Sequence, residues 1–192
     1  MKVGFIGLGN VGSKLSGSLL RNKVDLYVHD LNRDLVQKFK GFGATIANSP
    51  REMMNICDVV ITCLPSPSIS ASVMEGADGL LNSIKPSKVW MEMSTTDEAE
   101  VKRLGALVKN KGGQPVDCPV SGGCHRADTG NISIFAGCER ETFEFIFPLL
   151  KKMGRRILHT GPLGSASILK VLTNYLATAN LITCSEALVV AK

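Results

Sequence analysis

Short apolar runs rich in Val and Ile alternate along this chain with longer segments whose apolar residues recur at helical spacing, such as Leu15, Leu19 and Leu20. The runs expected to form strands are 2–7, 25–30, 58–64, 88–93, 114–119, 132–136 and 156–159. Ser49 before Pro50 is a typical start for one of the intervening helices. Strands that alternate with helices predict an α/β fold with a doubly wound, mostly parallel sheet.

Composition argues against several other classes of protein. With 44% hydrophobic and 20% charged residues among 192, the chain can bury a core and should be globular. The 22 Lys and Arg residues are scattered and aromatic residues make up only 5% of the chain, so a nucleic-acid surface is not expected. The modest excess of basic residues suits a small anionic ligand equally well.

The cysteines and the apolar stretches bear on the compartment. The six cysteines form no CxxC pair and have no His at ligand spacing, so we expect no metal site and mostly reduced, partly buried thiols. The N-terminal run MKVGFIGLG is too short for a signal peptide. Polar residues between Val171 and Ser185 prevent that stretch from spanning a bilayer. These features predict a soluble protein of the cytoplasm or an organelle matrix, without a membrane partner.

A glycine-rich hexapeptide, GLGNVG, directly follows the first expected strand and begins a helix. Here the first glycine allows a tight turn, the second lets a pyrophosphate approach the backbone, and the third lets helix and strand pack closely. Free amides at the helix N-terminus would hold the phosphates. We therefore expect a Rossmann-type site for a dinucleotide on the six residues of this motif, namely Gly7, Leu8, Gly9, Asn10, Val11 and Gly12.

Asp30 lies 18 positions beyond Gly12, at the end of the second expected strand. Its carboxylate could accept hydrogen bonds from the adenosine ribose and would repel the 2′-phosphate of NADP. Leu31 offers that phosphate no positive charge. Arg33 is close enough in the sequence to offer one, so some use of NADP stays open. The alternative is that Asp30 has only a structural role, because Asp is common in turns such as the one expected before Leu31 and Asn32. NAD is the cofactor we expect.

The motif DCPVSGG, at 117–123, follows another apolar segment. A serine and two glycines at the end of a strand expose backbone amides that can hold a carboxylate, and the Ser121 hydroxyl is a further donor. Ser121, Gly122 and Gly123 are therefore candidate substrate-binding residues. A flexible loop explains the same spacing equally well.

From Ser165 to Lys192 the chain has no Gly or Pro, which predicts one helix of about 28 residues, about 42 Å long. Lys170 and Asn174 share a face of it. Apolar neighbours would lower the pKa of Lys170 and suit it to proton exchange with an alcohol, although most helical lysines only face solvent. We predict a dinucleotide-binding domain over 1–163 and, over 164–192, the start of an interdomain helix leading to an absent all-helical domain. The apolar residues of this helix lie on more than one of its faces, which predicts a homo-oligomer.

Together, GFIGLGNVG, DCPVSGG and the segment from Lys170 to Asn174 resemble the β-hydroxyacid dehydrogenase family along the whole chain. The resemblance implies a Rossmann-type domain followed by a helical domain that closes the substrate cleft. It implies that Lys170 is the general acid and base, and that Asn174 helps to hold the substrate. The other residues to which the resemblance gives a role are Ser121, Gly122 and Gly123 for the substrate carboxylate, and Leu64, Pro65 and Thr95 for the cofactor.

Four residues depart from the family pattern. Val11 replaces a methionine of the glycine motif, and Glu92 stands where aspartate is common. Ala166 replaces a glycine ahead of the lysine, and Thr173 replaces the first of two asparagines. These departures leave the lysine chemistry intact and make the substrate less certain.

The sequence thus predicts an oxidoreductase that transfers a hydride between NAD and a small anionic 3-hydroxy acid, similar to 3-hydroxyisobutyrate. Lys170 would exchange the hydroxyl proton. Two alternatives are an imine reductase on the same scaffold and a catalytically silent NAD-binding module. Both resemble groups that have usually lost the lysine, so Lys170 argues against them.

Overall fold

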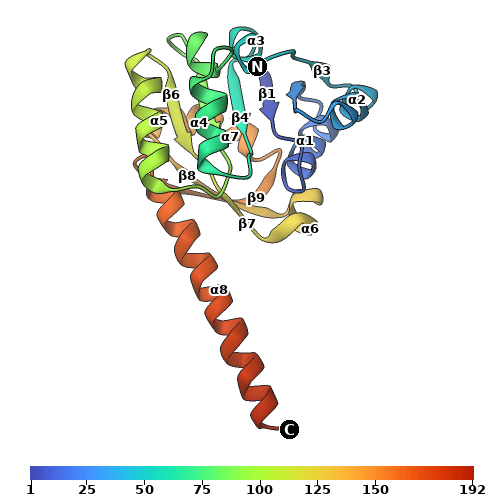
Figure 1. Ribbon diagram of the computed structural model, residues 1–192, viewed down its shortest axis with the longest axis vertical. Coiled ribbons are helices and arrows are strands. Elements are labelled where there is room, and N and C mark those ends of the chain that lie inside the picture. The colour runs from blue at the N-terminus through green and yellow to red at the C-terminus, as the bar shows by residue number, and fades with distance from the viewer.

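The computed structural model describes residues 1–192 and shows one sheet with helices on both faces (Figure 1). Its strands are β1 (Lys2–Ile6), β2 (Asp25–His29), β3 (Thr45–Ile46), β4 (Val59–Thr62), β5 (Val89–Glu92), β6 (Gln114–Asp117), β7 (Val120–Ser121), β8 (Ile132–Gly137) and β9 (Gly154–Gly161). All seven runs expected from the Val and Ile pattern are strands. The sequence analysis missed β3 and β7 because two residues are too few to show an alternation.

The helices are α1 (Gly12–Arg21), α2 (Arg33–Gly41), α3 (Pro50–Ile56), α4 (Pro67–Glu75), α5 (Glu98–Asn110), α6 (Gly123–Asp128), α7 (Arg140–Leu150) and α8 (Ser165–Val190), with a 3₁₀ turn η1 (Leu80–Asn82). Successive strand residues point to opposite faces of the sheet and build two cores. The larger contains Phe5 and Ile61 together with residues of α1, α2 and α7. The smaller contains Val60 and Trp90 with residues of α3, α4 and α5. Both faces of the sheet are therefore covered.

The strands follow the order β3-β2-β1-β4-β5-β6-β8-β7, with β9 beside β8. The strands from β3 to β6 pair in parallel, and the order reverses direction between β1 and β4. Such a reversal opens a crevice at the carboxyl ends of the strands. Strand β8 is antiparallel to β6 and β7, since the short connection through α6 cannot make a parallel crossover. The predicted doubly wound, mostly parallel sheet is confirmed.

Helix α8 has 26 residues and extends away from the sheet (Figure 1). Only Ala166 and Ser167, in its first turn, are buried. Apolar side chains farther along are open to solvent, with Leu181 at 68% and Leu188 at 73% exposure. The single long helix expected from the sequence is confirmed, and most of its apolar surface has no partner within the chain.

None of the helices combines the length and the apolarity that crossing a lipid bilayer requires.

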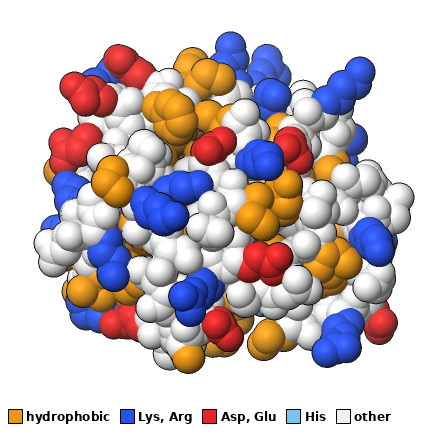
Figure 2. Space-filling model, turned by 90° about the horizontal axis from the view of Figure 1, so that it is seen from above, with side chains coloured by type: hydrophobic (Ala, Val, Ile, Leu, Met, Phe, Trp, Pro, Cys, Tyr) orange, Lys and Arg blue, Asp and Glu red, His pale blue; other side chains and the backbone are white.

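Charged groups are distributed over the surface. On the face shown in Figure 2, Lys and Arg side chains lie among Asp and Glu side chains, with apolar side chains between them. Arg103 of α5 pairs with both Glu75 and Glu100, which links α4 to α5. All six cysteines are free thiols, and three of them are buried.

Candidate active site

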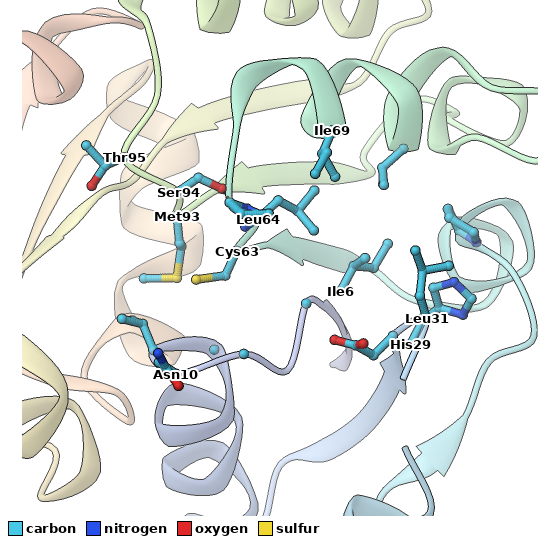
Figure 3. A pocket seen from close by; sticks show the side chains of 18 of the residues that line it. Ile6, Asn10, His29, Leu31, Cys63, Leu64, Ile69, Met93, Ser94 and Thr95 are labelled. Atoms are coloured by element: carbon cyan, nitrogen blue, oxygen red, sulfur yellow. Dashed lines mark hydrogen bonds between the residues drawn. The ribbon is translucent and has the colours of Figure 1, made fainter. Parts of the chain in front are cut away.

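A cavity of about 980 Å³ opens at the carboxyl ends of the strands, where the order of the sheet reverses (Figure 3). Eleven of the residues singled out from the sequence line it: Gly7, Gly9, Asn10, Val11, Gly12, Asp30, Leu64, Pro65, Thr95, Gly123 and Lys170. Residues far apart in the sequence thus share one cleft, at the place where α/β sheets bind ligands.

Geometry explains each glycine of the motif that follows β1. Gly7 has a φ of +96°, and a Cβ there would overlap the carbonyl oxygen of Cys63 on the neighbouring strand end. A Cβ on Gly12 would overlap the carbonyl of Gly7, so helix and strand pack closely only without one. A Cβ on Gly9, in contrast, would meet no atom within 4 Å. Nothing in the fold itself requires glycine at Gly9, which faces open space.

Helix α1 begins directly behind this loop and has no side-chain cap at its N-terminus. The amides of Ser13 and Lys14 already donate to the carbonyls of Gly9 and Val11, whereas those of Asn10, Val11 and Gly12 have no partner in the chain. These three amides are therefore available to a ligand, and the helix dipole favours a negative charge there. An open approach to Gly9 together with uncapped amides is the arrangement that a pyrophosphate needs. The residues present thus fit a dinucleotide.

Asp30 follows β2 and uses both carboxylate oxygens within the protein. Oδ2 accepts a hydrogen bond from the N–H of Leu8 at 2.6 Å, and Oδ1 accepts one from the N–H of Asn32 at 2.8 Å. The side chain of Leu8 is 1% exposed and belongs to the core, so only its backbone acts here. Asp30 therefore holds the glycine loop in place while lining the cavity, and each oxygen keeps a further lone pair for a ribose hydroxyl.

The opposite wall consists of the turns after β4 and β5 and of helix α4. The N–H of Leu64 donates to Oγ of Ser94 at 2.7 Å, which ties the two turns together. In Figure 3 the sulfur-bearing side chains of Cys63 and Met93 lie next to each other, between these turns and Asn10.

Leu64, Pro65 and Thr95 are the residues of this wall that were expected from the sequence. The cavity is also lined by residues that were not expected, namely Ile6, Cys63, Ile69, Val73, Met93 and Ser94. Cys63 and Met93 come directly after buried strands, and the carboxyl ends of parallel strands are where ligands bind. That position was the available signal. Ile69 and Val73 of α4 carried no such signal, because only the folded sheet brings α4 over the cleft.

Lys170 lies in the second turn of α8 and lines the same cavity. Its side chain is half-buried, and this burial lowers the pKa of its ammonium group below the usual value. The direction agrees with the expectation from its apolar neighbours in the sequence. A lysine with a lowered pKa is more readily neutral, which a proton acceptor requires.

The first turn of α8 is fixed to the sheet by Asp117, at the end of β6. Its Oδ2 accepts from the N–H of Ser167 at 2.7 Å, and its Oδ1 accepts from the Ser167 hydroxyl at 2.8 Å. Gly137 of β8 leaves room for this turn, since a Cβ there would lie 2.9 Å from Oγ of Ser165. These contacts immediately precede Lys170 and set its place in the cleft. The sequence analysis placed Asp117 in a motif but gave it no role.

The serine and glycines of the DCPVSGG motif are more ordered than a flexible loop. Ser121 lies in β7 and pairs with Ser133 of β8. Gly122 and Gly123 have φ values of +133° and +79° and lead into α6. Gly123 reaches the cavity, whereas Ser121 and Gly122 lie beside it. Asn174, one turn beyond Lys170, is exposed and does not line the cavity.

Comparisons with known proteins point in the same direction. Residues 2–161 match the family described as the NAD binding domain of 6-phosphogluconate dehydrogenase. The probable mitochondrial 3-hydroxyisobutyrate dehydrogenase of Dictyostelium discoideum is 33% identical over 97% of this chain and 58% of its own length. A solved structure of Mycobacterium tuberculosis 3-hydroxyisobutyrate dehydrogenase with L-serine has a TM-score of 0.93 at 26% identity, over 99% of this chain and 64% of that one.

An imine reductase from Myxococcus stipitatus, solved with NAD⁺, has a TM-score of 0.90 at 16% identity, over 97% of this chain and 64% of that one. At that identity the likeness shows the fold alone. The chain spans 58% of the length of the Dictyostelium relative. NAD, the cofactor expected from the glycine motif, is the ligand that the description of the matching family names. The chain therefore belongs to the family of NAD-binding domains of 6-phosphogluconate dehydrogenase, as its resemblance to the hydroxyacid dehydrogenases predicted.

Proposed function

We propose that this chain is the cofactor-binding part of an NAD-dependent dehydrogenase that oxidises a small 3-hydroxy acid similar to 3-hydroxyisobutyrate. The observation that carries the proposal is that Lys170 lines the same cavity as the glycine loop and Asp30. A dinucleotide with its adenosine at Asp30 and its pyrophosphate at Gly9 would extend along the cleft toward Lys170. The redox end of the cofactor would then lie beside the one lysine that lines the cavity.

The chain's own residues would divide the chemistry as follows. Bound NAD⁺ supplies the acceptor for the hydride that leaves the carbinol carbon. Lys170, in its neutral form, accepts the hydroxyl proton as the carbonyl forms, and it returns a proton in the reverse direction. Gly123, with Ser121 and Gly122 beside it, orients the substrate carboxylate, and Asn174 adds a contact once substrate lies over α8. Helix α8 thereby positions both Lys170 and Asn174.

The lining of the cleft supports a small acidic substrate. Gly123 and Lys170 both line the cavity, as do the apolar residues Val120 and Ile132 from the β7–β8 pair next to Gly123. A short acid with one carboxylate and one hydroxyl matches such a site. The names of the relatives point to the same class, since they contain 3-hydroxyisobutyrate and L-serine.

Imine reduction remains a weaker candidate. The imine reductase likeness concerns the fold alone, and a lysine placed to take up a hydroxyl proton suits an alcohol substrate better than an imine. A silent NAD-binding module would have no use for a half-buried lysine in the cleft.

Hydride transfer from deuterated substrates tests the proposal. The protein is incubated with NAD⁺ and with 3-hydroxyisobutyrate or L-serine deuterated at the carbinol carbon, and deuterated NADH is detected by mass spectrometry, so that slow transfer is registered. We expect transfer that falls by about 10²–10⁴-fold in Lys170→Met, with NAD affinity within a few fold of the parent. Transfer that is equal in both proteins would remove Lys170 from the mechanism.

A further inference from the structure

Glu92, at the end of β5, is buried behind the cofactor wall, with 1% of its surface exposed. Its Oε1 accepts hydrogen bonds from the N–H of Ser94 at 2.9 Å and from the Ser94 hydroxyl at 2.5 Å. The same hydroxyl accepts from the N–H of Leu64. Through Ser94, Glu92 is therefore connected to both turns that line the cavity.

The second oxygen of this carboxyl, Oε2, is buried without a partner. The hydroxyl of Ser70, on α4, is also buried without a partner, and it lies beside Glu92. Thr62 of β4 also lies beside Glu92, but its hydroxyl already donates to the carbonyl of Met91 at 3.5 Å and accepts from the Trp90 indole at 3.0 Å. Two unsatisfied polar atoms next to each other indicate a missing hydrogen bond between them.

No positive charge compensates Glu92 in this interior. Its titratable neighbours are Cys63, on the turn after β4, and Asp117, which lies opposite it in the β5–β6 register. Burial raises the pKa of the Cys63 thiol to about 12, so that group stays neutral. Asp117 is a second buried carboxyl whose pKa burial also raises, and it supplies no positive charge. Burial is the main cause that raises the pKa of Glu92 above its ordinary value.

We propose that Glu92 is a neutral carboxylic acid that donates from Oε2 to the Ser70 hydroxyl, and that it thereby acts as a positioning residue for the cofactor wall. One bond would satisfy both unpartnered atoms. It would fasten α4 to the turns after β4 and β5 through a single side chain. Ser70 points inward from α4, while Ile69 and Val73 of the same helix line the cavity. The wall formed by α4 and by the turns after β4 and β5 would thus depend on Glu92, although Glu92 does not line the cavity.

Glutamine is the matched substitution that tests the protonation state. Its amide offers an acceptor and a donor in place of C=O and O–H, so Glu92→Gln should preserve the network. An acid whose pKa is raised on folding binds its proton more tightly in the folded state than in the unfolded state, where the ordinary value is 4.5. The stability of the parent relative to Glu92→Gln must therefore fall as the pH rises above 4.5, by up to about tenfold in the unfolding equilibrium per pH unit, until the folded-state pKa is passed.

Urea denaturation of the two proteins from about pH 5 to about pH 8 measures this difference. A relative stability of the parent that stays constant or rises with pH would mean that Glu92 is ionised, and would overturn the proposal. The other titratable groups are common to both proteins and cancel in the comparison. This measurement needs no cofactor, so it remains decisive even if the proposed function fails.

Binding of NAD⁺ tests the positioning role, which rests on the proposed cofactor site. Glu92→Leu removes every polar contact of the side chain and should weaken the affinity for NAD⁺ about tenfold. Glu92→Gln should keep the affinity of the parent. If Glu92→Leu does not fold, Ser70→Ala replaces it, with a smaller loss in the same direction. An affinity for NAD⁺ in Glu92→Leu equal to that of the parent, or a loss in Glu92→Gln as large as in Glu92→Leu, would contradict the positioning role.

Discussion

Asp30 shows at the scale of one residue how a side chain can serve the fold and a ligand together. Its two oxygens hold the backbone of the glycine loop at Leu8 and of the following turn at Asn32. The same carboxylate lines the cleft, where it can accept from a ribose and would repel a phosphate.

We therefore predict that NAD binds at least about tenfold more tightly than NADP, a difference of about 1.4 kcal/mol. Asp30→Asn keeps an acceptor for the N–H of Leu8 but removes the charge. The ratio of the NAD affinity to the NADP affinity should therefore become smaller, mainly because NADP binds more tightly. Calorimetric titration of both cofactors against both proteins measures this. Equal affinities in the parent protein would show that the carboxylate does not select the cofactor.

Single residues were also where prediction from sequence was least complete. Gly7, Gly9, Gly12 and Asp30 could be named because the motif ties each residue type to a geometric need. Glu92 was noted only as a departure from a pattern. The link from Glu92 through Ser94 to Leu64, and the bonds from Ser167 to Asp117, join segments distant in the sequence, and no local spacing encodes them.

Among the elements, α8 depends on a small anchor. Two hydrogen bonds from Ser167 to Asp117 fix its first turn, whereas most later turns are exposed. Because the Ser167 hydroxyl donates to a buried carboxyl, Ser167→Ala should lower the free energy of unfolding by about 1.5–3 kcal/mol.

Ser185→Ala is the matched control on the same helix. Its hydroxyl bonds only to the carbonyl of Leu181 on an exposed stretch, so its effect should stay within about 0.5 kcal/mol. Chemical denaturation of the three proteins gives both values. Equal effects at the two serines would mean that the bonds to Asp117 do not anchor the helix.

The exposed part of α8 carries a second prediction. Ile168, Val171, Leu176, Leu181 and Leu188 are each at least 48% exposed. Burying one such side chain contributes about 1.5–3 kcal/mol, so the chain should associate with itself through this helix. Sedimentation should show dimers or larger species.

Leu181→Lys combined with Leu188→Lys should shift this protein toward the monomer. Thr178→Lys combined with Asn180→Lys adds the same charge at polar positions and should change association less. A parent protein that sediments as a monomer at high concentration would contradict the role given to the apolar face of α8.

Helices and strands could be predicted from the sequence wherever the hydrophobic pattern extended over several residues. Seven strands and the 26-residue α8 follow from runs that extend over several residues. The two-residue strands β3 and β7 depend on tertiary contacts and could not be predicted. Without β7, the short connection that makes β8 antiparallel could not be recognised either.

Across the whole molecule, the order of the strands decides where chemistry can occur. The reversal between β1 and β4 places the glycine loop, Asp30 and the turns after β4 and β5 around one cavity. The base of α8 then packs against β8 and brings Lys170 to the same cavity. The sheet could be predicted from the strand and helix patterns. Those patterns do not bring Lys170 to the glycine loop, which only the family resemblance implied, because that placement depends on how α8 is anchored.

The central claim is that this cleft holds NAD with its nicotinamide beside Lys170. A crystal structure of the protein with NAD⁺ tests it most directly. We predict the adenosine ribose at Asp30, the pyrophosphate against Gly9 and the free amides of Asn10, Val11 and Gly12, and the nicotinamide ring beside Lys170. A cofactor bound in the reverse direction, with its adenine at Lys170, or bound outside this cavity, would contradict the claim.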